Sequence, residues 1–337
     1  MSATYPVIDV HCHMMTAAAS ELVAQHYSPD HIFANEPYDL YAGTPSRDRN
    51  KSLGPTLLPK LGGVEPRLAD MDRMGVDVQV LAPFVSQNFH WTDAALGRQL
   101  ARLQNERLAD VAATHPDRFA AIGTVPLQDT ATAVAELDHL VGSLGMKGVQ
   151  ISSNINGLDL DDPRFVPFWE RAQELGAVVL IHPSGFTEAR RLDDWFLTNL
   201  IGNPLDSTIA LSRLIFSGRL AQFPDLRLVV VHGGGYLPFY NARLDHGWEN
   251  RPEARVYIDK PPSSYLKQVY FDTMVFTPRE LSHLLEFAGA DHVMLGTDYP
   301  FDMGEPDPVG LTGRIDLSDE ERAQVRGGNA AKLFGLL

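Results

Sequence analysis

Residues 177–182 read AVVLIH, and residues 228–232 read LVVVH. In each segment a short run of aliphatic and β-branched side chains leads directly into a histidine. The runs are apolar without alternation, which is typical of parallel strands that helices cover on both faces. Each segment therefore predicts a buried parallel strand with a polar side chain at its carboxyl end.

Short apolar runs of this kind recur along the whole chain and give eight candidate strands. They span residues 7–10, 76–81, 119–125, 148–151, 177–181, 226–231, 269–271 and 293–295. Segments with helical periodicity separate most of them, for example 96–113, 131–144 and 165–175. Repeated alternation of strand and helix predicts an α/β fold with a parallel sheet. Eight units favour a closed (β/α)8 TIM barrel, and an open doubly wound sheet is the alternative.

The interval after the first strand breaks this alternation. Residues 14–66 contain scattered proline, glycine, asparagine and tyrosine and show little periodicity. Because long loops in compact domains usually serve a function, we expect an insertion that acts as a lid or a subunit contact. No linker or repeat divides the sequence, so residues 1–337 are predicted to form a single barrel domain.

Composition narrows the range of partners. The 337 residues include 28 basic and 43 acidic side chains, and the formal net charge of -15 would repel nucleic acid. No apolar run is as long as a membrane span, so we expect no membrane partner. Cys12 is the only cysteine, which leaves no internal disulfide. These features, and a start without a secretory signal, predict a cytoplasmic protein.

His11 and His13 lie at the end of the first predicted strand. Residues two apart on a strand share one face, so the two imidazoles can converge on a metal ion while Cys12 points away. A His-x-His pair also occurs by chance on protein surfaces. Whether this pair binds a metal ion therefore depends on the residues at the other strand ends.

Three further strand ends carry His182, His232 and Asp298. In a barrel the carboxyl ends of all strands form one rim, where active sites are found, so we expect these residues to meet the first pair. Three histidines and an aspartate suit zinc, with iron, cobalt or manganese as alternatives. Lys147 precedes its strand and lies at the wrong end to bridge two ions. We expect one divalent ion per chain.

Two other features leave alternatives open. The glycines at 233–235 either form a flexible turn or allow a close backbone approach that a side chain would prevent. His90 and Trp91 either line the rim or pack in the core. Neither a phosphate-binding glycine motif nor a nucleophile elbow is present, so we expect no organic cofactor and no covalent serine or cysteine chemistry.

The motifs at the strand ends resemble the amidohydrolase superfamily (amidohydrolase 2 family), and within it the branch of aminocarboxymuconate semialdehyde decarboxylase and related non-oxidative decarboxylases. The resemblance spans nearly the whole chain. Its carriers are Asp9-Val10-His11-Cys12-His13, Gly148-Val149-Gln150-Ile151, His182-Pro183, His232-Gly233-Gly234-Gly235 with Pro238-Phe239 and Arg243, and Gly296-Thr297-Asp298-Tyr299-Pro300-Phe301 with Gly304-Glu305.

The resemblance implies a metal ion held by His11, His13, His182 and Asp298 together with a bound water. Asp298 would be a catalytic residue as well as a ligand. His232 would be the catalytic acid and base that activates the water and moves protons.

The resemblance also implies that Arg243 reaches into the neighbouring subunit's site and binds a substrate carboxylate, so we expect a homodimer. The alternative is a surface arginine paired with Asp245 or Glu249. The branch has a second substrate-binding arginine in its opening insertion, and here Arg47 and Arg49 are the candidates.

These residues together predict an enzyme. We expect a metal-dependent carboxy-lyase that decarboxylates a small unsaturated or aromatic carboxylic acid. The alternative with the same metal chemistry is a hydrolase or hydratase that acts on a ring-cleavage product or a lactone. A non-catalytic metal-binding protein is the alternative of another class.

Overall fold

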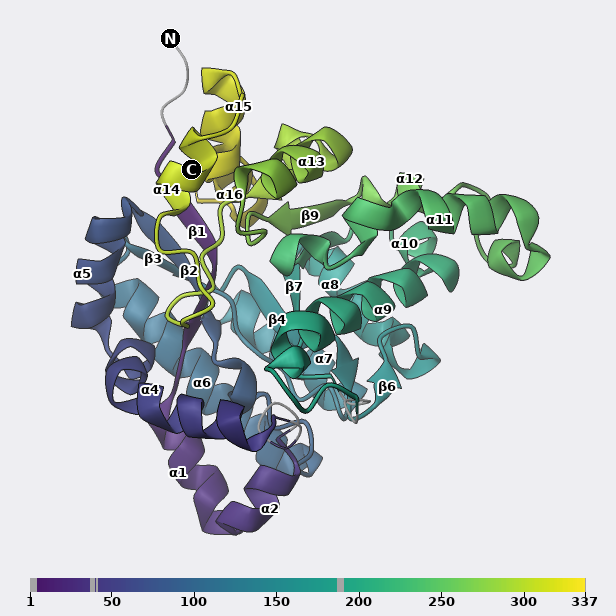
Figure 1. Ribbon diagram of the computed structural model, residues 1–337. Coiled ribbons are helices and arrows are strands. Elements are labelled where there is room, and N and C mark those ends of the chain that lie inside the picture. Colours follow the sequence, from purple (N-terminus) through teal and green to yellow (C-terminus); the bar gives the residue numbers. More distant parts are fainter. Residues whose placement is uncertain (1–4, 37–39, 41, 187–190, 337) are drawn as a thin grey trace.

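The structure is a computed structural model that describes residues 5–36, 40, 42–186 and 191–336 (Figure 1). All eight predicted strands are present. They are β1 (Ile8–Met14), β2 (Val78–Pro83), β3 (Phe119–Ala121), β4 (Gly148–Ser152), β7 (Val178–His182), β8 (Arg227–Val230), β9 (Val269–Asp272) and β10 (Val293–Met294). A short hairpin of β5 (Asn154–Ile155) and β6 (Leu158–Asp159) follows β4.

The eight strands close into a ring. One parallel sheet has the order β1-β2-β3, and the other has the order β10-β9-β8-β7-β4. The backbone bridges Gly123 to Val149 and Cys12 to Tyr299 join the two sheets at both sides. The barrel prediction is confirmed, and the open doubly wound sheet is wrong.

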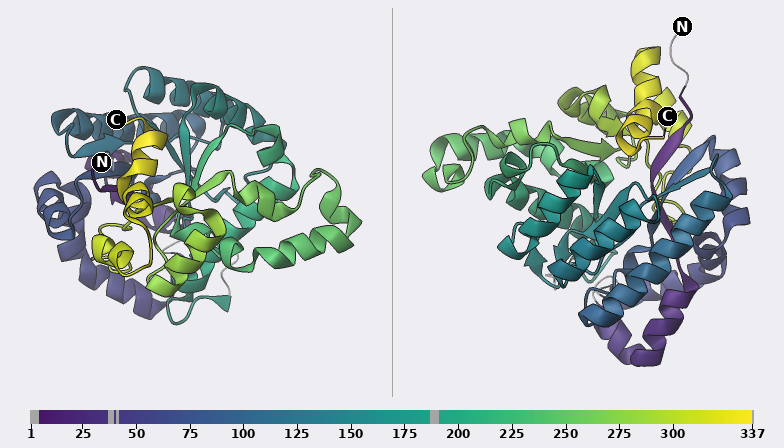
Figure 2. Two further views of the ribbon diagram at one scale, coloured as in Figure 1. Left: turned by 90° about the horizontal axis from the view of Figure 1, so that it is seen from above. Right: turned by 180° about the vertical axis from the view of Figure 1, so that it is seen from behind.

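Helices surround this ring, as the view from above shows (Figure 2). They are α5 (Val64–Met74), α6 (Ala94–Thr114), α7 (Thr130–Gly142), α8 (Val166–Leu175), α9 (Asn203–Phe216), α10 (Arg219–Gln222), α11 (Leu237–Asn250), α12 (Pro262–Leu266), α13 (Pro278–Ala288), α14 (Pro308–Gly313), α15 (Asp319–Ala323) and α16 (Asn329–Phe334). Asp93 and Asp129 cap α6 and α7 by accepting from Leu96 N and Thr132 N, each at 2.9 Å. None of the described helices is both long enough and apolar enough to cross a membrane.

The continuous apolar runs have a direct structural cause. Val178 and Leu180 belong to a cluster inside the ring, whereas Val179 and Ile181 belong to the layer between the ring and the helices. Successive side chains thus enter two different apolar layers, and no position on the strand faces water. Helix α16 contributes Phe334 to the inner cluster.

The insertion at residues 14–66 is not the loop that its sequence suggested. Most of it is helical, in α1 (Ala17–His26), α2 (Pro29–Ala34) and α4 (Thr44–Gly62). Pro55 and Pro59 lie inside α4, and Leu61 is its one buried residue among those described. Prolines inside a segment and the lack of an apolar stripe are both typical of loops. The sequence pattern therefore did not predict this helix.

A substitution of Trp169 on α8 tests how much the packing of the outer apolar layer contributes to stability. The side chain of Trp169 is fully buried, and the indole N–H donates to Leu160 O at 3.0 Å. Trp169→Ala should lower the free energy of unfolding by about 3–5 kcal/mol in urea titration. The matched control is Trp195→Ala, since Trp195 is 82% exposed and should change stability by less than about 0.5 kcal/mol. Equal unfolding midpoints for the two variants would contradict this packing.

Candidate metal centre

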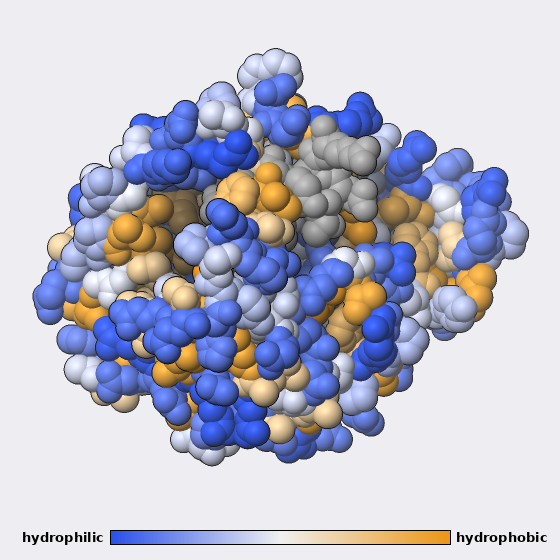
Figure 3. Space-filling model, turned by 90° about the horizontal axis from the view of Figure 1, so that it is seen from below, coloured by the Kyte–Doolittle hydropathy of each residue, from blue (hydrophilic) through white to orange (hydrophobic). Residues whose placement is uncertain are grey.

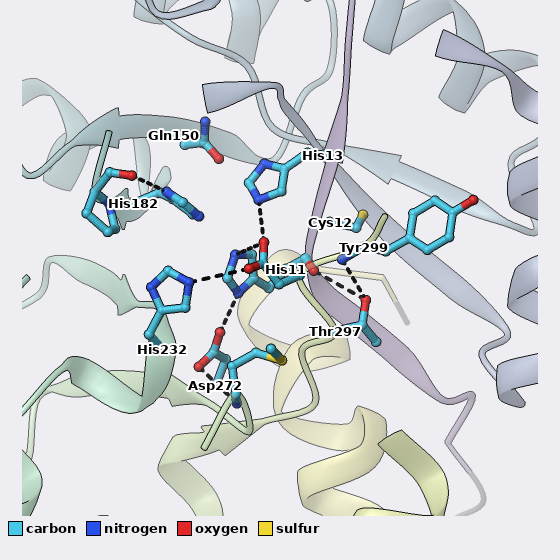
Figure 4. A network of polar contacts seen from close by, with 12 residues as sticks. His11, Cys12, His13, Gln150, His182, His232, Asp272, Thr297 and Tyr299 are labelled. Atoms are coloured by element: carbon cyan, nitrogen blue, oxygen red, sulfur yellow. Dashed lines mark hydrogen bonds and ion pairs between the residues drawn. The ribbon is translucent and has the colours of Figure 1, made fainter. Parts of the chain in front are cut away.

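The residues predicted at the strand ends meet at the carboxyl end of the ring (Figure 4). His11, His13, His182 and Asp298 are all buried, and one ligand atom from each lies within 4.8 Å of those of the others. His232 stands beside them, with its ring centroid 5.0 Å from that of His182. The predicted convergence is confirmed.

A β-bulge in β1 aims its two histidines. Asp9 pairs with Gln79 and Cys12 pairs with Leu81, so β1 has one residue more than β2 over this stretch. Before the bulge Ile8 fills the ring interior, and after it His13 pairs with Ala82 on the same inner side. The extra residue therefore lets one strand supply both core and ligands, as bulges beside active sites often do. Cys12 points outward, and its Sγ contacts Val80 O at 3.4 Å.

Each of the three ligand histidines is held by its Nδ1 atom. The acceptors are Asp272 Oδ2 for His11 (2.6 Å), Pro83 O for His13 (3.3 Å) and Pro183 O for His182 (2.7 Å). These oxygens only accept, so Nδ1 carries the proton and Nε2 presents a lone pair to the centre. Nε2 of His11 and of His182 are buried without a hydrogen-bond partner among the described residues. Metal-binding histidines are anchored in this way, and the residues fit a metal ion.

The charges around the centre favour a cation. Burial alone would raise the pKa of Asp298, but the imidazoles of His11 and His13 hold it well below its usual range. Burial alone would lower the pKa of His11, but the carboxylates of Asp298 and Asp272 raise it to about 10. Burial lowers the pKa of His182 well below its usual value, which keeps that ligand neutral. The two carboxylates thus favour positive charge between them, and a divalent ion bound there would supply it in place of the second proton on His11.

His232 and Asp298 reach the centre from unusual backbone conformations. Both have φ of +55°, a left-handed conformation that non-glycine residues rarely adopt and that clusters at functional sites. A Cβ on Gly233 would lie 2.4 Å from Val275 Cγ1, and one on Gly234 would lie 2.5 Å from Phe271 Cε1. The glycines at 233–235 therefore permit a close approach within the turn that follows β8.

No role was predicted from the sequence for two buried carboxylates of the site. Asp272 ends β9 and bonds to His11, and the signal for it in the sequence is a carboxylate directly after the apolar run 269–271. Asp9 accepts from Thr297 Oγ1 (2.6 Å), Gln79 Nε2 (2.9 Å) and His11 N (3.0 Å), and burial raises its pKa to about 6. Asp9 thus ties the strand of His11 to the loop of Asp298. The fully buried Arg67 extends this network by donating to Gln79 Oε1 at 3.0 Å.

A cavity of about 320 Å³ opens above the centre. Figure 3 views the molecule from this end, where apolar side chains lie among polar ones around a hollow. Helix α4 contributes Leu53, Leu57, Leu58 and Leu61 to the cavity wall. Other lining residues include His182, His232, Asp298, Phe84, Phe301 and Met303. None of the described residues that line it is a lysine or arginine.

The remaining candidates lie outside the centre. Arg243 is exposed on α11 and does not line the cavity of its own chain. Arg49 lies at the outer edge, 3.9 Å from Asp302, and Arg47 bonds to Thr44 Oγ1 at 3.1 Å. Lys147 bonds through its backbone to Ala121 at the amino end of β4, as predicted. His90 is buried, and burial lowers its pKa to about 4.

Fold and site together define a metal-binding α/β barrel whose centre lies at the carboxyl-end rim. The amidohydrolase family (Amidohydro_2) matches residues 8–336, and the chain belongs to this family. The chain is 34% identical over 272 residues to 2-amino-3-carboxymuconate-6-semialdehyde decarboxylase from Dictyostelium discoideum, covering 80% of this chain and 76% of that protein.

Solved structures agree with this assignment. The 5-carboxyvanillate decarboxylase of Sphingomonas paucimobilis superposes with a TM-score of 0.86 at 27% identity, covering 99% of this chain and 100% of that one. The 5-carboxyvanillate decarboxylase of Novosphingobium aromaticivorans, solved with manganese and 4-hydroxy-3-methoxy-5-nitrobenzoic acid, also gives 0.86 at 27% identity and covers 98% and 96%.

One metal equivalent per chain is the expected stoichiometry, because the described residues form one group of converging ligands. The double variant His11→Ala/His13→Ala should bind less than about a tenth of an equivalent, since two of four ligands are lost. Elemental analysis after gel filtration measures this. His139→Ala on α7 is the control and should retain one equivalent. Two equivalents in the unmodified protein, or full binding by the double variant, would overturn the assignment.

Proposed function

We propose that the protein is a metal-dependent non-oxidative decarboxylase of a small aromatic or unsaturated carboxylic acid. The observation that carries the proposal is the arrangement of the centre. Four ligands converge at the floor of an apolar cavity, and a fifth polar residue, His232, lines the same cavity. Relatives that this chain matches over most of their length include decarboxylases, although a 2-keto-4-carboxy-3-hexenedioate hydratase is also among them.

The ligand set and the relatives bear on the identity of the metal. A divalent ion held by His11, His13, His182 and Asp298 would supply a Lewis acid that stabilises negative charge on a substrate oxygen. Zinc suits this mixture of imidazole and carboxylate, and manganese occurs in a solved relative. We expect zinc first and manganese as the alternative.

Proton transfer falls to His232. Its Nε2 lies 3.6 Å from Asp298 Oδ2, and its Nδ1 is buried without a hydrogen-bond partner among the described residues. Decarboxylation replaces a carboxylate on carbon by a proton. The proton adds to that carbon, the bond to the carboxylate carbon breaks, and the electron pair of that bond restores the unsaturated system as carbon dioxide leaves. We expect His232 to give this proton as a general acid.

The cavity wall selects the substrate class. The leucines of α4 and the rings of Phe84 and Phe301 suit a flat apolar body. Asn203 also lines the cavity, and its Oδ1 has no hydrogen-bond partner among the described residues, so it can accept from a substrate hydroxyl. Because α4 belongs to the insertion at 14–66, the insertion would act as the lid of this site.

A product assay with the unmodified protein and a His232 variant tests the proposal. Hydroxylated aromatic acids and unsaturated dicarboxylic acids, supplied with zinc or manganese, should release carbon dioxide, and a chelator should abolish the release. His232→Asn should keep the metal and lose at least about 10²-fold in turnover, the usual scale for a positioned acid. Asparagine is the better replacement here because it tolerates the left-handed backbone of residue 232.

Three results would contradict this assignment. Incorporation of labelled water without carbon dioxide would indicate a hydrolase or hydratase. Metal binding without turnover on any acid would indicate a non-catalytic protein. Loss of metal in His232→Asn would make His232 a ligand.

Arg243 completes the proposed site from a second copy of the chain. Helix α11 projects from the body of the molecule in both figures that show the whole fold (Figures 1 and 2). Among the described residues Arg243 has no ion pair with Asp245 or Glu249, and Asp245 accepts from Ser263 N at 2.9 Å instead. A projecting, exposed cation fits the predicted contact with a substrate carboxylate in the partner subunit.

Mixed dimers test this contact. Arg243→Ala and His232→Asn chains should each be nearly inactive alone. Their hybrid dimer should recover partial activity, because one of its two sites contains both intact residues. Co-purification with two different affinity tags isolates the hybrid. A hybrid with no more activity than its parents would exclude the shared site, as would a monomer in analytical ultracentrifugation.

A further inference from the structure

Asp272 contacts two parts of the site at once. We propose that Asp272 is a positioning residue whose two carboxylate oxygens fix the metal ligand His11 and the turn that carries His232. The aspartate is fully buried at the end of β9 and does not line the cavity. It therefore acts through its neighbours and not on the substrate.

The first contact sets the tautomer of His11. Asp272 Oδ2 lies 2.6 Å from His11 Nδ1, and both side chains are excluded from water. A carboxylate that faces the Nδ1 atom of a metal-binding histidine accepts its N–H, and this arrangement leaves Nε2 of His11 free for a metal ion.

The second contact holds the backbone beside His232. Asp272 Oδ1 accepts from Gly233 N at 2.7 Å and from Met274 N at 3.3 Å. His232 and Gly233 both have left-handed backbones, with φ of +55° and +59°. A non-glycine residue keeps such a conformation only where its surroundings fix it, and the bond from the next amide supplies this restraint.

The packing leaves just enough room for the two-sided contact. A Cβ on Gly296 would lie 2.9 Å from Asp272 Cβ and 3.0 Å from His11 Cβ. Glycine at 296 thus allows the aspartate and the histidine to approach from β9 and β1, the strands on either side of β10. Gly296→Ala should push the pair apart without removing any hydrogen-bonding group.

An asparagine at 272 can preserve only one of the two contacts as an acceptor, because an amide has only one oxygen. Two backbone donors meet Oδ1, so the amide oxygen should stay there and the NH₂ group should face His11 Nδ1. Two donors cannot bond, and His11 would move its proton to Nε2, where it opposes metal binding. Asp272→Asn should therefore weaken zinc binding by about 10–100-fold and keep Gly233 protected from hydrogen exchange. Asp272→Ala should lose both properties.

Two measurements without any substrate test the proposal. Competition with a chromophoric chelator gives the zinc dissociation constant, and amide hydrogen exchange of the zinc-loaded protein reports the turn at 232–235. Asp206→Asn is the matched control, since Asp206 is a buried carboxylate bonded to Asn154 at 3.1 Å and outside the centre. Gly296→Ala should also weaken zinc binding.

The proposal is overturned if Asp272→Asn binds zinc as tightly as Asp206→Asn with unchanged exchange at Gly233. It is also overturned if Asp272→Ala leaves that exchange unchanged. Should Asp272→Ala fail to fold, Asp272→Asn and Gly296→Ala still decide the question through zinc affinity. None of these results depends on whether the protein is a decarboxylase.

Discussion

Two buried carboxylates, Asp272 and Asp298, lie on opposite ring nitrogens of His11, at 2.6 Å and 3.3 Å. Carboxylates withdrawn from water must be compensated by positive charge and hydrogen bonds, or the fold is destabilised. This requirement organises the carboxyl-end rim: β1, β7 and β10 lead to the four ligands, and β2 and β9 supply the anchors Pro83 and Asp272. The affinity of the site for a divalent cation follows from the same requirement.

The apolar core of the barrel offsets the energetic cost of burying these polar groups together. The amino-terminal half of the ring is filled by apolar side chains from the strands and α16, and its outer layer is continuous with the surrounding helices. The polar residues are confined to one end, where the β-bulge in β1 changes the side chains that face inward from apolar to imidazole. The insertion then places α4 over that end, so a substrate meets an apolar wall and a charged floor in one cavity.

The sequence alone predicts the strands and the ligands well, because both depend on local patterns. A continuous apolar run followed by histidine is visible at 177–182 without any knowledge of neighbouring strands. Helix α4 was not predicted, because its internal prolines and absent apolar stripe oppose the usual signals, and its position over the cavity is set by tertiary packing. Asp9 and Arg67 were also missed as site residues, since their meaning depends on Gln79 and Thr297, which approach them only in the folded barrel.

The proposed function requires that three histidine ring nitrogens and one carboxylate oxygen hold a single divalent ion. Crystals grown with manganese, measured for anomalous scattering, test this claim most directly. The account predicts one anomalous peak per chain, coordinated by Nε2 of His11, His13 and His182 and by Asp298, with His232 adjacent but not coordinating. A peak that recruits His232 in place of one of these ligands, or that lies elsewhere in the barrel, would contradict it.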